Sequence, residues 1–219
     1  PGAPHGLKMA CGENPKRVYG QKGGPATRMG NVAGYRAAFI DAADYRDKRA
    51  KGDDKGKRDL KLETLAGALD GEILVHIHCY RADEMATMLD LANEFGFKVA
   101  AFHHGVEAYK IADRLGREGV CGALWADWWG FKMEAFDGIQ ENVAIVDRAP
   151  GSCAIVHSDS DEGIQRLNQE AAKVMANARR AGIDIAPEHA ITWLTANPAK
   201  AMGIAARTGT LEAGKMADV

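Results

Sequence analysis

The feature that most constrains the fold of this chain is an alternation of apolar runs and amphipathic segments after residue 70. Runs typical of buried strands cover 72–78, 98–103, 120–125 and 152–157. Each run is followed by a helical pattern, over 82–95, 106–117, 133–146 and 162–181. Apolar strands that alternate with helices form parallel sheets covered by helices. The sequence therefore predicts an α/β fold, either a doubly wound sheet or a (β/α) barrel.

The ends of the chain have a different character. Residues 20–27 are typical of a loop, 33–50 of an exposed helix, and 49–58, where charges of both signs alternate with glycine, of a solvated connector. Near the other end, Pro187 and Asn197 each mark the start of a short helix. We expect these segments to surround the sheet rather than to form it.

Composition limits the kinds of partner. The 219 residues carry a net charge of -2, which gives no general field to attract nucleic acid or an anionic membrane. No apolar run approaches the ~20 residues that a membrane-spanning helix requires, and the first residues do not resemble a signal peptide. We therefore expect a small-molecule substrate, no nucleic acid and no membrane, with the cytoplasm favoured although no compartment is fixed.

The four cysteines are scattered along the chain. Cys11, Cys79, Cys121 and Cys153 lie in or beside apolar runs, and no two form a Cys-x-x-Cys pair. This pattern predicts buried thiols rather than a disulfide framework.

Polar residues stand at the ends of three predicted strands. His78, His104 and Asp159 fall at or just past the carboxyl ends of their runs, where parallel β/α folds place catalytic groups. Imidazole nitrogens and a carboxylate suit a borderline divalent cation such as zinc, and a carboxylate beside the cation can accept a proton from water. These positions indicate metal-assisted hydrolysis.

Each of these residues also has a structural interpretation. A single histidine is more often a hydrogen-bonded core or surface residue, and Asp159 fits a helix N-cap. His76 lies on the same strand face as His78, two residues earlier. His103 competes with His104 for the position on the next strand. His157 precedes Asp159 by two residues and suits a hydrogen bond to a ligand.

The C-terminal segment resembles a known family. Residues 194–204, Leu-Thr-Ala-Asn-Pro-Ala-Lys-Ala-Met-Gly-Ile, and residues 208–219, Thr-Gly-Thr-Leu-Glu-Ala-Gly-Lys-Met-Ala-Asp-Val, are similar to the closing signature of the amidohydrolase superfamily, in its imidazolonepropionase-like and dipeptidase-like branch. The resemblance implies the C-terminal part of a (β/α)8 TIM-like metallo-hydrolase barrel. Residues 1–204 would supply about strands 4 to 8, and residues 205–219 the start of a strand returning to a small β-sandwich.

The resemblance also assigns roles to residues. His78 resembles the family's fifth-strand metal histidine, His104 the sixth-strand histidine, and Asp159 the eighth-strand aspartate, which is both ligand and catalytic base. Lys8 resembles the fourth-strand lysine that is carbamylated to bridge two metals. The implied cofactor is one or two divalent ions, with Zn²⁺ favoured.

Further residues near these strand ends are candidates for the pocket. Tyr80 and Arg81 directly follow His78, and the arginine fork suits a substrate carboxylate. A tryptophan-rich segment after the run 120–125 suits a pocket wall, with Trp125, Trp128 and Trp129 as its aromatic residues. Surface pairing and loop packing are the structural alternatives.

The resemblance implies hydrolysis of an amide or related C–N bond in a cyclic amide, a dipeptide or an N-acyl amino acid. Because no first-strand His-x-His pair stands upstream of Lys8, we expect a larger enzyme of which this is the second part. The alternative is a catalytically incomplete half-barrel that acts as a metal-binding scaffold. The open sheet edges of such a half would favour a homo-oligomer or pairing with the missing N-terminal half. A nucleotide-binding domain is disfavoured, since no glycine-rich phosphate loop follows any strand.

Overall fold

The computed structural model describes residues 2–53, 56–128 and 130–217. Within these ranges, five parallel strands form one sheet: β1 (His5–Ala10), β2 (Ile73–His78), β3 (Val99–His103), β4 (Cys121–Leu124) and β5 (Ala154–Val156). The spatial order β1-β2-β3-β4-β5 follows the chain. A doubly wound sheet reverses its strand order at a switch point, and this sheet does not. The predicted α/β class is confirmed, and the strand order is that of a partial (β/α) barrel.

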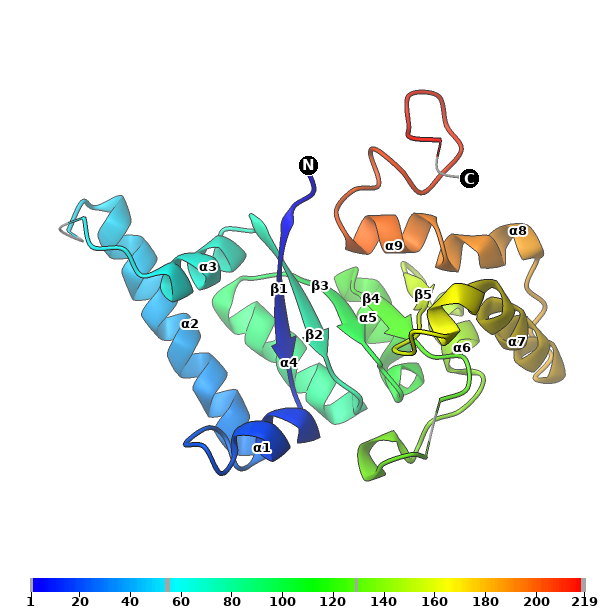
Figure 1. Cartoon of the computed structure of the whole chain (residues 1–219), viewed down its shortest axis with the longest axis horizontal. Coiled ribbons are helices and arrows are strands. Elements are labelled where there is room, and N and C mark those ends of the chain that lie inside the picture. The colour runs from blue at the N-terminus through cyan, green and yellow to red at the C-terminus, as the bar shows by residue number, and fades with distance from the viewer. Residues whose placement is uncertain (1, 54–55, 129, 218–219) are drawn as a thin grey trace.

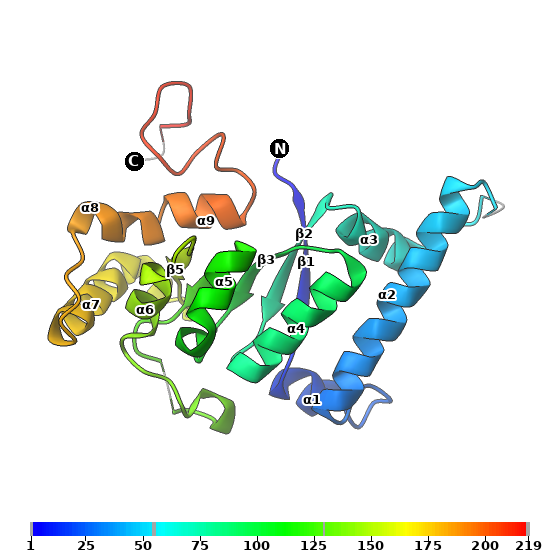
Figure 2. The ribbon, with the colours of Figure 1, turned by 180° about the vertical axis from the view of Figure 1, so that it is seen from behind.

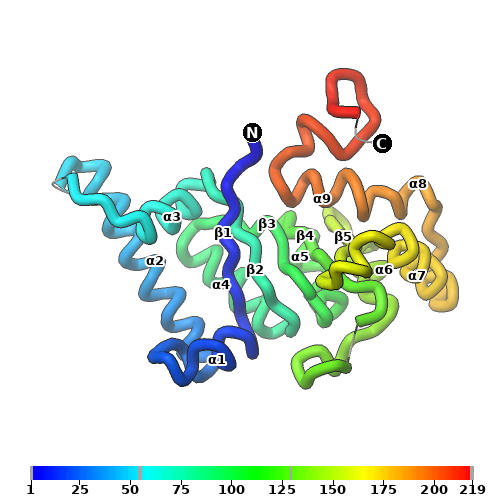
Figure 3. Tube along the Cα trace, viewed as in Figure 1, coloured from blue at the N-terminus to red at the C-terminus, as the bar shows by residue number. Residues whose placement is uncertain are grey.

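Helices connect and flank the strands (Figures 1 and 3). They are α1 (Glu13–Tyr19), α2 (Arg28–Ala50), α3 (Leu60–Leu69), α4 (Ala82–Phe95), α5 (Ala112–Glu118), α6 (Asn142–Arg148), α7 (Leu167–Arg180), α8 (Pro187–Ala190) and α9 (Ala196–Ala201). From behind, α4, α5 and α6 lie in front of the strands, and α3 lies beside β1 and β2 (Figure 2). Helices thus cover one face of the sheet, which we call the covered face. We call the opposite face, toward the viewer in Figure 1, the open face.

The main hydrophobic core lies between the covered face and the helices. The strands contribute side chains that are at most 2% exposed: Val75, Ile77, Phe102, Leu124 and Val156. Helix α2 contributes Phe39, whose ring stacks on Phe97 at a centroid distance of 4.5 Å. Burial of such side chains stabilises the fold by roughly 1.5–3 kcal/mol each, so this core holds the strand ends in place.

The open face carries a smaller apolar cluster at β3, β4 and β5. Its members are Ala101, Cys121, Ala123, Cys153, Ile155 and Ala201. Ala201 belongs to α9, and the Asn197 side-chain amide of the same helix donates to the Ala154 carbonyl oxygen at 2.7 Å. Helix α9 therefore packs against this face near β5.

The strand register aligns polar side chains across the open face. In the parallel ladder Lys8 is opposite His76, Ala10 is opposite His78, and His78 is opposite His103. Since side chains alternate between the two faces of a strand, residues of one row share one face. The register thus places the predicted histidines side by side.

The cysteines are buried, as predicted, but the interpretation as free thiols was wrong. Cys11 pairs with Cys79, and Cys121 pairs with Cys153, with Cα atoms 5.2 Å and 4.4 Å apart. Each pair joins residues that lie in adjacent strands or directly flank them. Neighbouring parallel strands bring such residues together whatever their separation along the chain, and spacing alone does not reveal this.

Several helical segments differ from the sequence prediction. The helices predicted over 106–117 and 162–181 begin later, as α5 at Ala112 and α7 at Leu167, and the helix predicted over 33–50 begins earlier, as α2 at Arg28. Helix α4 has the predicted bounds and ends at Gly96, which has the left-handed conformation of a C-cap. The predicted helix over 133–146 instead divides into a 3-10 turn at Met133–Ala135, a loop that contains Gly138, and the short α6. Helices α1 and α3 were not predicted, although Asp59 caps α3 through bonds to Lys61 and Leu62 backbone amides.

Two further observations concern membrane-spanning helices and the C-terminal segment. Among the described residues, no helix is both long and apolar enough to cross a membrane. The described part of the C-terminal segment, 205–217, contains turns and no strand. The predicted start of a β-sandwich strand in this segment stays a prediction.

Candidate functional site

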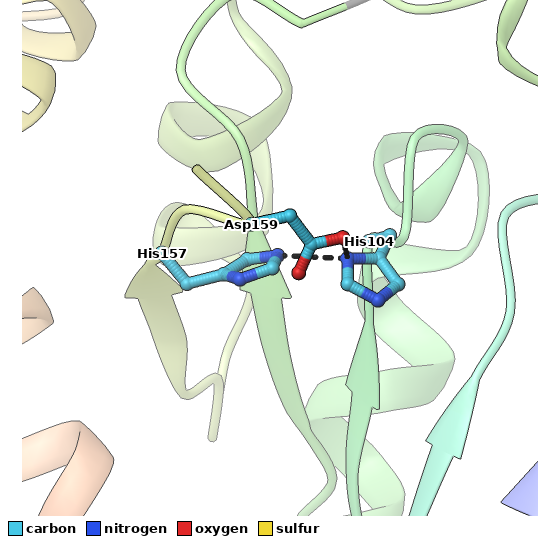
Figure 4. A group of neighbouring side chains, drawn as sticks. All are labelled: His104, His157 and Asp159. Carbon is cyan, nitrogen blue, oxygen red and sulfur yellow. Dashed lines mark hydrogen bonds and ion pairs between the residues drawn. The ribbon is translucent and has the colours of Figure 1, made fainter. Parts of the chain in front are cut away.

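Three polar side chains converge at the carboxyl ends of β3 and β5 (Figure 4). The Nδ1 atom of His104 lies 3.2 Å from His157 Nε2 and 3.4 Å from Asp159 Oδ2. One ligand atom from each residue lies within 4.8 Å of the others. We call His104, His157 and Asp159 the His-His-Asp cluster.

The backbone at His104 has an unusual conformation that aims its ring. Its φ is 63°, and among the described residues it is the one non-glycine residue with positive φ. Its amide donates to the Ala123 carbonyl oxygen on β4 at 2.9 Å, so the ladder continues past the end of β3. A non-glycine residue held at positive φ costs about 1–3 kcal/mol and is concentrated at functional sites.

Burial keeps the imidazoles neutral. It lowers the pKa of His104 to about 2, with further lowering from His157 and His78. Burial lowers the pKa of His157 to about 4, while the Asp159 carboxylate opposes this shift. Neutral imidazole is the form that binds a metal ion. Both rings are therefore ready as ligands at neutral pH.

His78 lies beside the cluster without belonging to it. Its ring centroid is 4.7 Å from that of His104, and its Nε2 atom is 3.0 Å from the Asn14 side-chain nitrogen. Burial and then the charge of Lys132 lower its pKa to about 4. Asn14, on α1, is a neighbour that the sequence did not single out.

Lys8, His76 and His103 occupy the same face beside the cluster, and the His103 ring centroid lies 6.1 Å from those of His104 and His157. Lys8 is exposed, and its charge contributes to the low pKa of His103 and His157. The His103 Nε2 atom lies 3.0 Å from His76 Nδ1, so these two histidines pair with each other. The structure thus brings His104, rather than His103, to Asp159.

Tyr80 and Arg81 diverge after β2. The Tyr80 side chain is buried, and its ring stacks on His104 at a centroid distance of 5.7 Å. Arg81 instead donates to Asp83 through Nε at 3.0 Å and Nη2 at 3.3 Å. Tyr80 therefore forms a wall of the site, whereas the Arg81 fork is engaged on the first turn of α4.

The segment between β4 and α6, residues 125–141, forms a loop beside Tyr80. Trp125 is tilted on His104 at 5.0 Å between centroids, and Phe131 packs against Trp125 at 5.6 Å. Trp128 packs on Trp125 at 5.4 Å, and Trp129 lies outside the described residues. Aromatic rings thus form the wall of the cluster on this side.

The same loop brings charge to the site. The Lys132 ammonium nitrogen lies 3.9 Å from the Tyr80 ring centroid and 2.8 Å from Glu134 Oε1. The Glu134 side chain is 1% exposed, and its Oε2 accepts a hydrogen bond from the Glu13 amide at 2.9 Å. Sequence reasoning missed both residues: Lys132 lies between the tryptophan-rich segment and the helix predicted over 133–146, and Glu134 lies in the first turn of that predicted helix. The loop is therefore part of the site.

The donor set of the cluster suits a metal ion. Two imidazole nitrogens and a carboxylate oxygen are the donors that bind zinc and similar borderline cations. Three protein ligands leave a coordination position for water or substrate, as in catalytic zinc sites. His157, expected only as a neighbour of the ligands, lies close enough to be one.

Comparisons with known proteins identify the family that this chain is similar to. Residues 135–219 match the model of the amidohydrolase family. The chain is 31% identical over 238 aligned positions to amidohydrolase tasK of Hapsidospora irregularis, which covers 97% of this chain and 23% of the relative. It is 35% identical, with a TM-score of 0.83, to the crystal structure of an amidohydrolase from Thermotoga maritima MSB8, over 97% of this chain and 55% of that one. The chain therefore spans between about a quarter and about half of the length of these relatives.

Proposed function

The chain belongs to the amidohydrolase superfamily, and on this premise we propose that the protein hydrolyses an amide or related C–N bond with a divalent cation. The observation that carries the proposal is the convergence of His104, His157 and Asp159 on one point at the strand ends. Their donor atoms are neutral nitrogen and carboxylate oxygen, which bind such an ion without further ionisation.

His104, His157 and Asp159 would hold the ion, with Zn²⁺ favoured. A divalent cation supplies Lewis-acid polarisation of a carbonyl group and makes a nearby water molecule more acidic. His78 is a further ligand in this proposal, provided that the contact between its Nε2 atom and the Asn14 side-chain nitrogen is broken. Lys8, as a carbamate, would serve a second ion, and its place in the row of His76 puts it on the correct face.

Asp159 is the proposed proton carrier. Its side chain is 53% exposed, whereas the His104 side chain is 5% exposed, so the carboxylate faces the side from which a substrate enters. It would accept a proton from the attacking water and return it to the leaving nitrogen. The Tyr80, Trp125 and Phe131 rings would limit the access of bulk water to this step.

The proposed substrates are a cyclic amide, a dipeptide or an N-acyl amino acid. Each offers one carbonyl group to polarise and one nitrogen to protonate, which matches the roles given to the cluster. The aromatic rings of the loop suit an apolar side chain on such a molecule.

Metal content and hydrolysis of an amide panel test this function together. We expect the purified protein to bind zinc, and His104→Asn, His157→Gln and Asp159→Asn each to weaken zinc binding at least about 10-fold. Asparagine suits position 104 because it tolerates positive φ. The matched controls are Asp161→Asn and His5→Gln, which change exposed residues of the same types outside the cluster.

Two outcomes would contradict the proposal. Unchanged hydrolysis in Asp159→Asn, with unchanged activity in Asp161→Asn, would remove the proton role of Asp159. If zinc binds at the cluster but no panel compound is hydrolysed, the protein is a metal-binding scaffold rather than an enzyme.

A further inference from the structure

We propose that Lys132 binds a carboxylate group of the substrate, so that the site prefers an acidic amide to a neutral one. This inference rests on the proposed function and narrows its substrate class. Of the three candidate substrates, an N-acyl amino acid and a dipeptide carry a carboxylate next to the scissile amide, and a neutral cyclic amide does not.

The Tyr80 ring connects Lys132 to the His-His-Asp cluster, because it contacts both Lys132 and His104. Its Nζ atom lies 3.9 Å from the Tyr80 ring centroid, and the Tyr80 ring stacks on His104 at 5.7 Å. The positive charge also contributes to the low pKa of His78. The ammonium group and His104 therefore both contact the ring of Tyr80.

Contacts on two sides fix the ammonium group without using all its donors. Glu134 Oε1 is 2.8 Å away, and this carboxylate is itself held by the Glu13 amide. The Tyr80 ring face lies on another side, in cation–π geometry. An ammonium group has three N–H donors, and the Lys132 side chain is 23% exposed. One donor is thus available to a ligand that enters the site.

Glu134 would compete with a substrate carboxylate for the Lys132 ammonium group. Glu134 also has a second cationic neighbour, Arg28. Its Oε2 atom lies 3.7 Å from Nη2 of Arg28, and the Arg28 Nε atom donates to Glu84 at 2.9 Å. Lys132 therefore shares Glu134 with a second cation. This buried carboxylate, which has two cationic neighbours, orients Lys132 beside the Tyr80 ring.

Arg81 is the other candidate for binding a substrate carboxylate. The Nε and Nη2 atoms of its guanidinium both donate to Asp83, and its side chain is 43% exposed. The histidines contribute no positive charge, because burial holds their pKa values low. Lys132 is thus the better-placed group for an anion beside Tyr80.

Two ligands that differ only in the carboxylate test the proposal by calorimetric titration. The probes are N-acetyl-L-leucine and N-isopentylacetamide, which is the same molecule without its carboxylate. Lys132→Gln is expected to weaken binding of the acid about 10- to 100-fold, the loss typical of a hydrogen bond to a charged group. Binding of the neutral amide should stay within about twofold.

Two further variants control the test. Lys132→Arg keeps the charge and should retain most of the affinity for the acid. Lys98→Gln removes an exposed lysine just before β3, at the opposite end of the strands, and should change neither affinity. Circular dichroism melts establish that each variant is folded.

Equal losses for the acid and the neutral amide in Lys132→Gln would overturn the proposal, since they would indicate that Lys132 only positions Glu134 and the loop. Equal affinity of the wild-type protein for the two probes would overturn it too. The titration requires no turnover. A protein that binds the acid through Lys132 but hydrolyses no amide would therefore contradict the proposed function and leave the carboxylate site standing.

Discussion

Successive residues of β2 and β3 lie in opposite environments on the two faces of the sheet. Ile77 and Phe102 are fully buried under the helices, whereas their neighbours His78 and His103 lie on the open face among other histidines. Alternate residues of these strands therefore have two different roles. One face supplies apolar burial, and the other carries nitrogen ligands.

This difference shows where the stability for the site comes from. Desolvated neutral histidines and a strained His104 backbone are unfavourable on their own. The apolar core on the other face of the same strands compensates for them. Changes on the covered face should thus affect folding, and changes on the open face should affect ligand binding.

The largest expected contrast is between two adjacent residues of β3. Phe102→Ala should lower the free energy of unfolding by about 3–5 kcal/mol, because it leaves a cavity in the main core. His103→Ala should lower it by only about 0.5–1.5 kcal/mol, the contribution of its hydrogen bond to His76. Urea unfolding of both variants measures the difference. Equal losses of unfolding free energy in the two variants would contradict the different roles of the two faces.

The two disulfides provide a second contrast, since one lies on each face. Cys11 and Cys79 belong to the main core, and Cys121 and Cys153 to the small cluster on the open face. Replacing either pair by alanine should cost about 2–4 kcal/mol, slightly more for the first pair because its separation is 68 residues rather than 32. The control is thiol titration of the unfolded, unreduced protein, which should find no reactive thiol. Four reactive thiols per chain would contradict the pairing.

The open face should make stability depend on pH. In the folded chain the pKa values of His78, His103 and His157 are lowered to about 4, below the ordinary value near 6.5 of the unfolded chain. The unfolded state therefore binds more protons as the pH falls. Stability is fully present above pH ~6.5 and is lost between pH ~6.5 and ~4, by at most about 1.4 kcal/mol per pH unit for each histidine.

The contribution of His103 to this pH dependence can be measured with a single variant. His103→Gln should reduce the slope of unfolding free energy against pH between pH 7 and 5, measured by urea unfolding without metal. His189→Gln is the matched control, because His189 is half exposed and lies away from the open face beside Asp147. A slope that stays the same in His103→Gln would contradict burial as the cause.

The smallest effect is expected on the outer surface of the helices. Arg36 of α2 and Glu94 of α4 form an ion pair in which both side chains are more than 40% exposed. Arg36→Ala should change the unfolding free energy by less than about 1 kcal/mol, since exposed pairs are screened by water and salt. Thermal melts at low and high salt measure it, and a loss as large as that of Phe102→Ala would show that the covering helices depend on surface charge.

Local patterns predicted the sheet well. The apolar runs located four of the five strands of the described sheet, β2 to β5, to within about three residues, and α4 began and ended where the periodicity placed it. These features depend on residues that are close in sequence. The helix predicted over 133–146 failed because contacts of Phe131 and Lys132 with Tyr80 and Trp125 draw this segment over the site instead.

The site was predicted in part, for a related reason. Strand-end position indicated His104 and Asp159, which the structure brings together. The place of His157 in the cluster depends on its distance from His104, which spacing along one chain segment does not give. The disulfides and Lys132 also depend on contacts between distant segments, and no local signal marks them.

The most direct test of the central claim is anomalous X-ray scattering at the zinc edge from crystals of the protein grown with zinc. We predict an anomalous peak within about 2.0–2.3 Å of a nitrogen of His104, a nitrogen of His157 and an oxygen of Asp159. The peak should be lost in His104→Asn and retained in His5→Gln. Zinc bound elsewhere on the chain, with no peak at these three residues, would contradict a metal centre on the open face of the sheet.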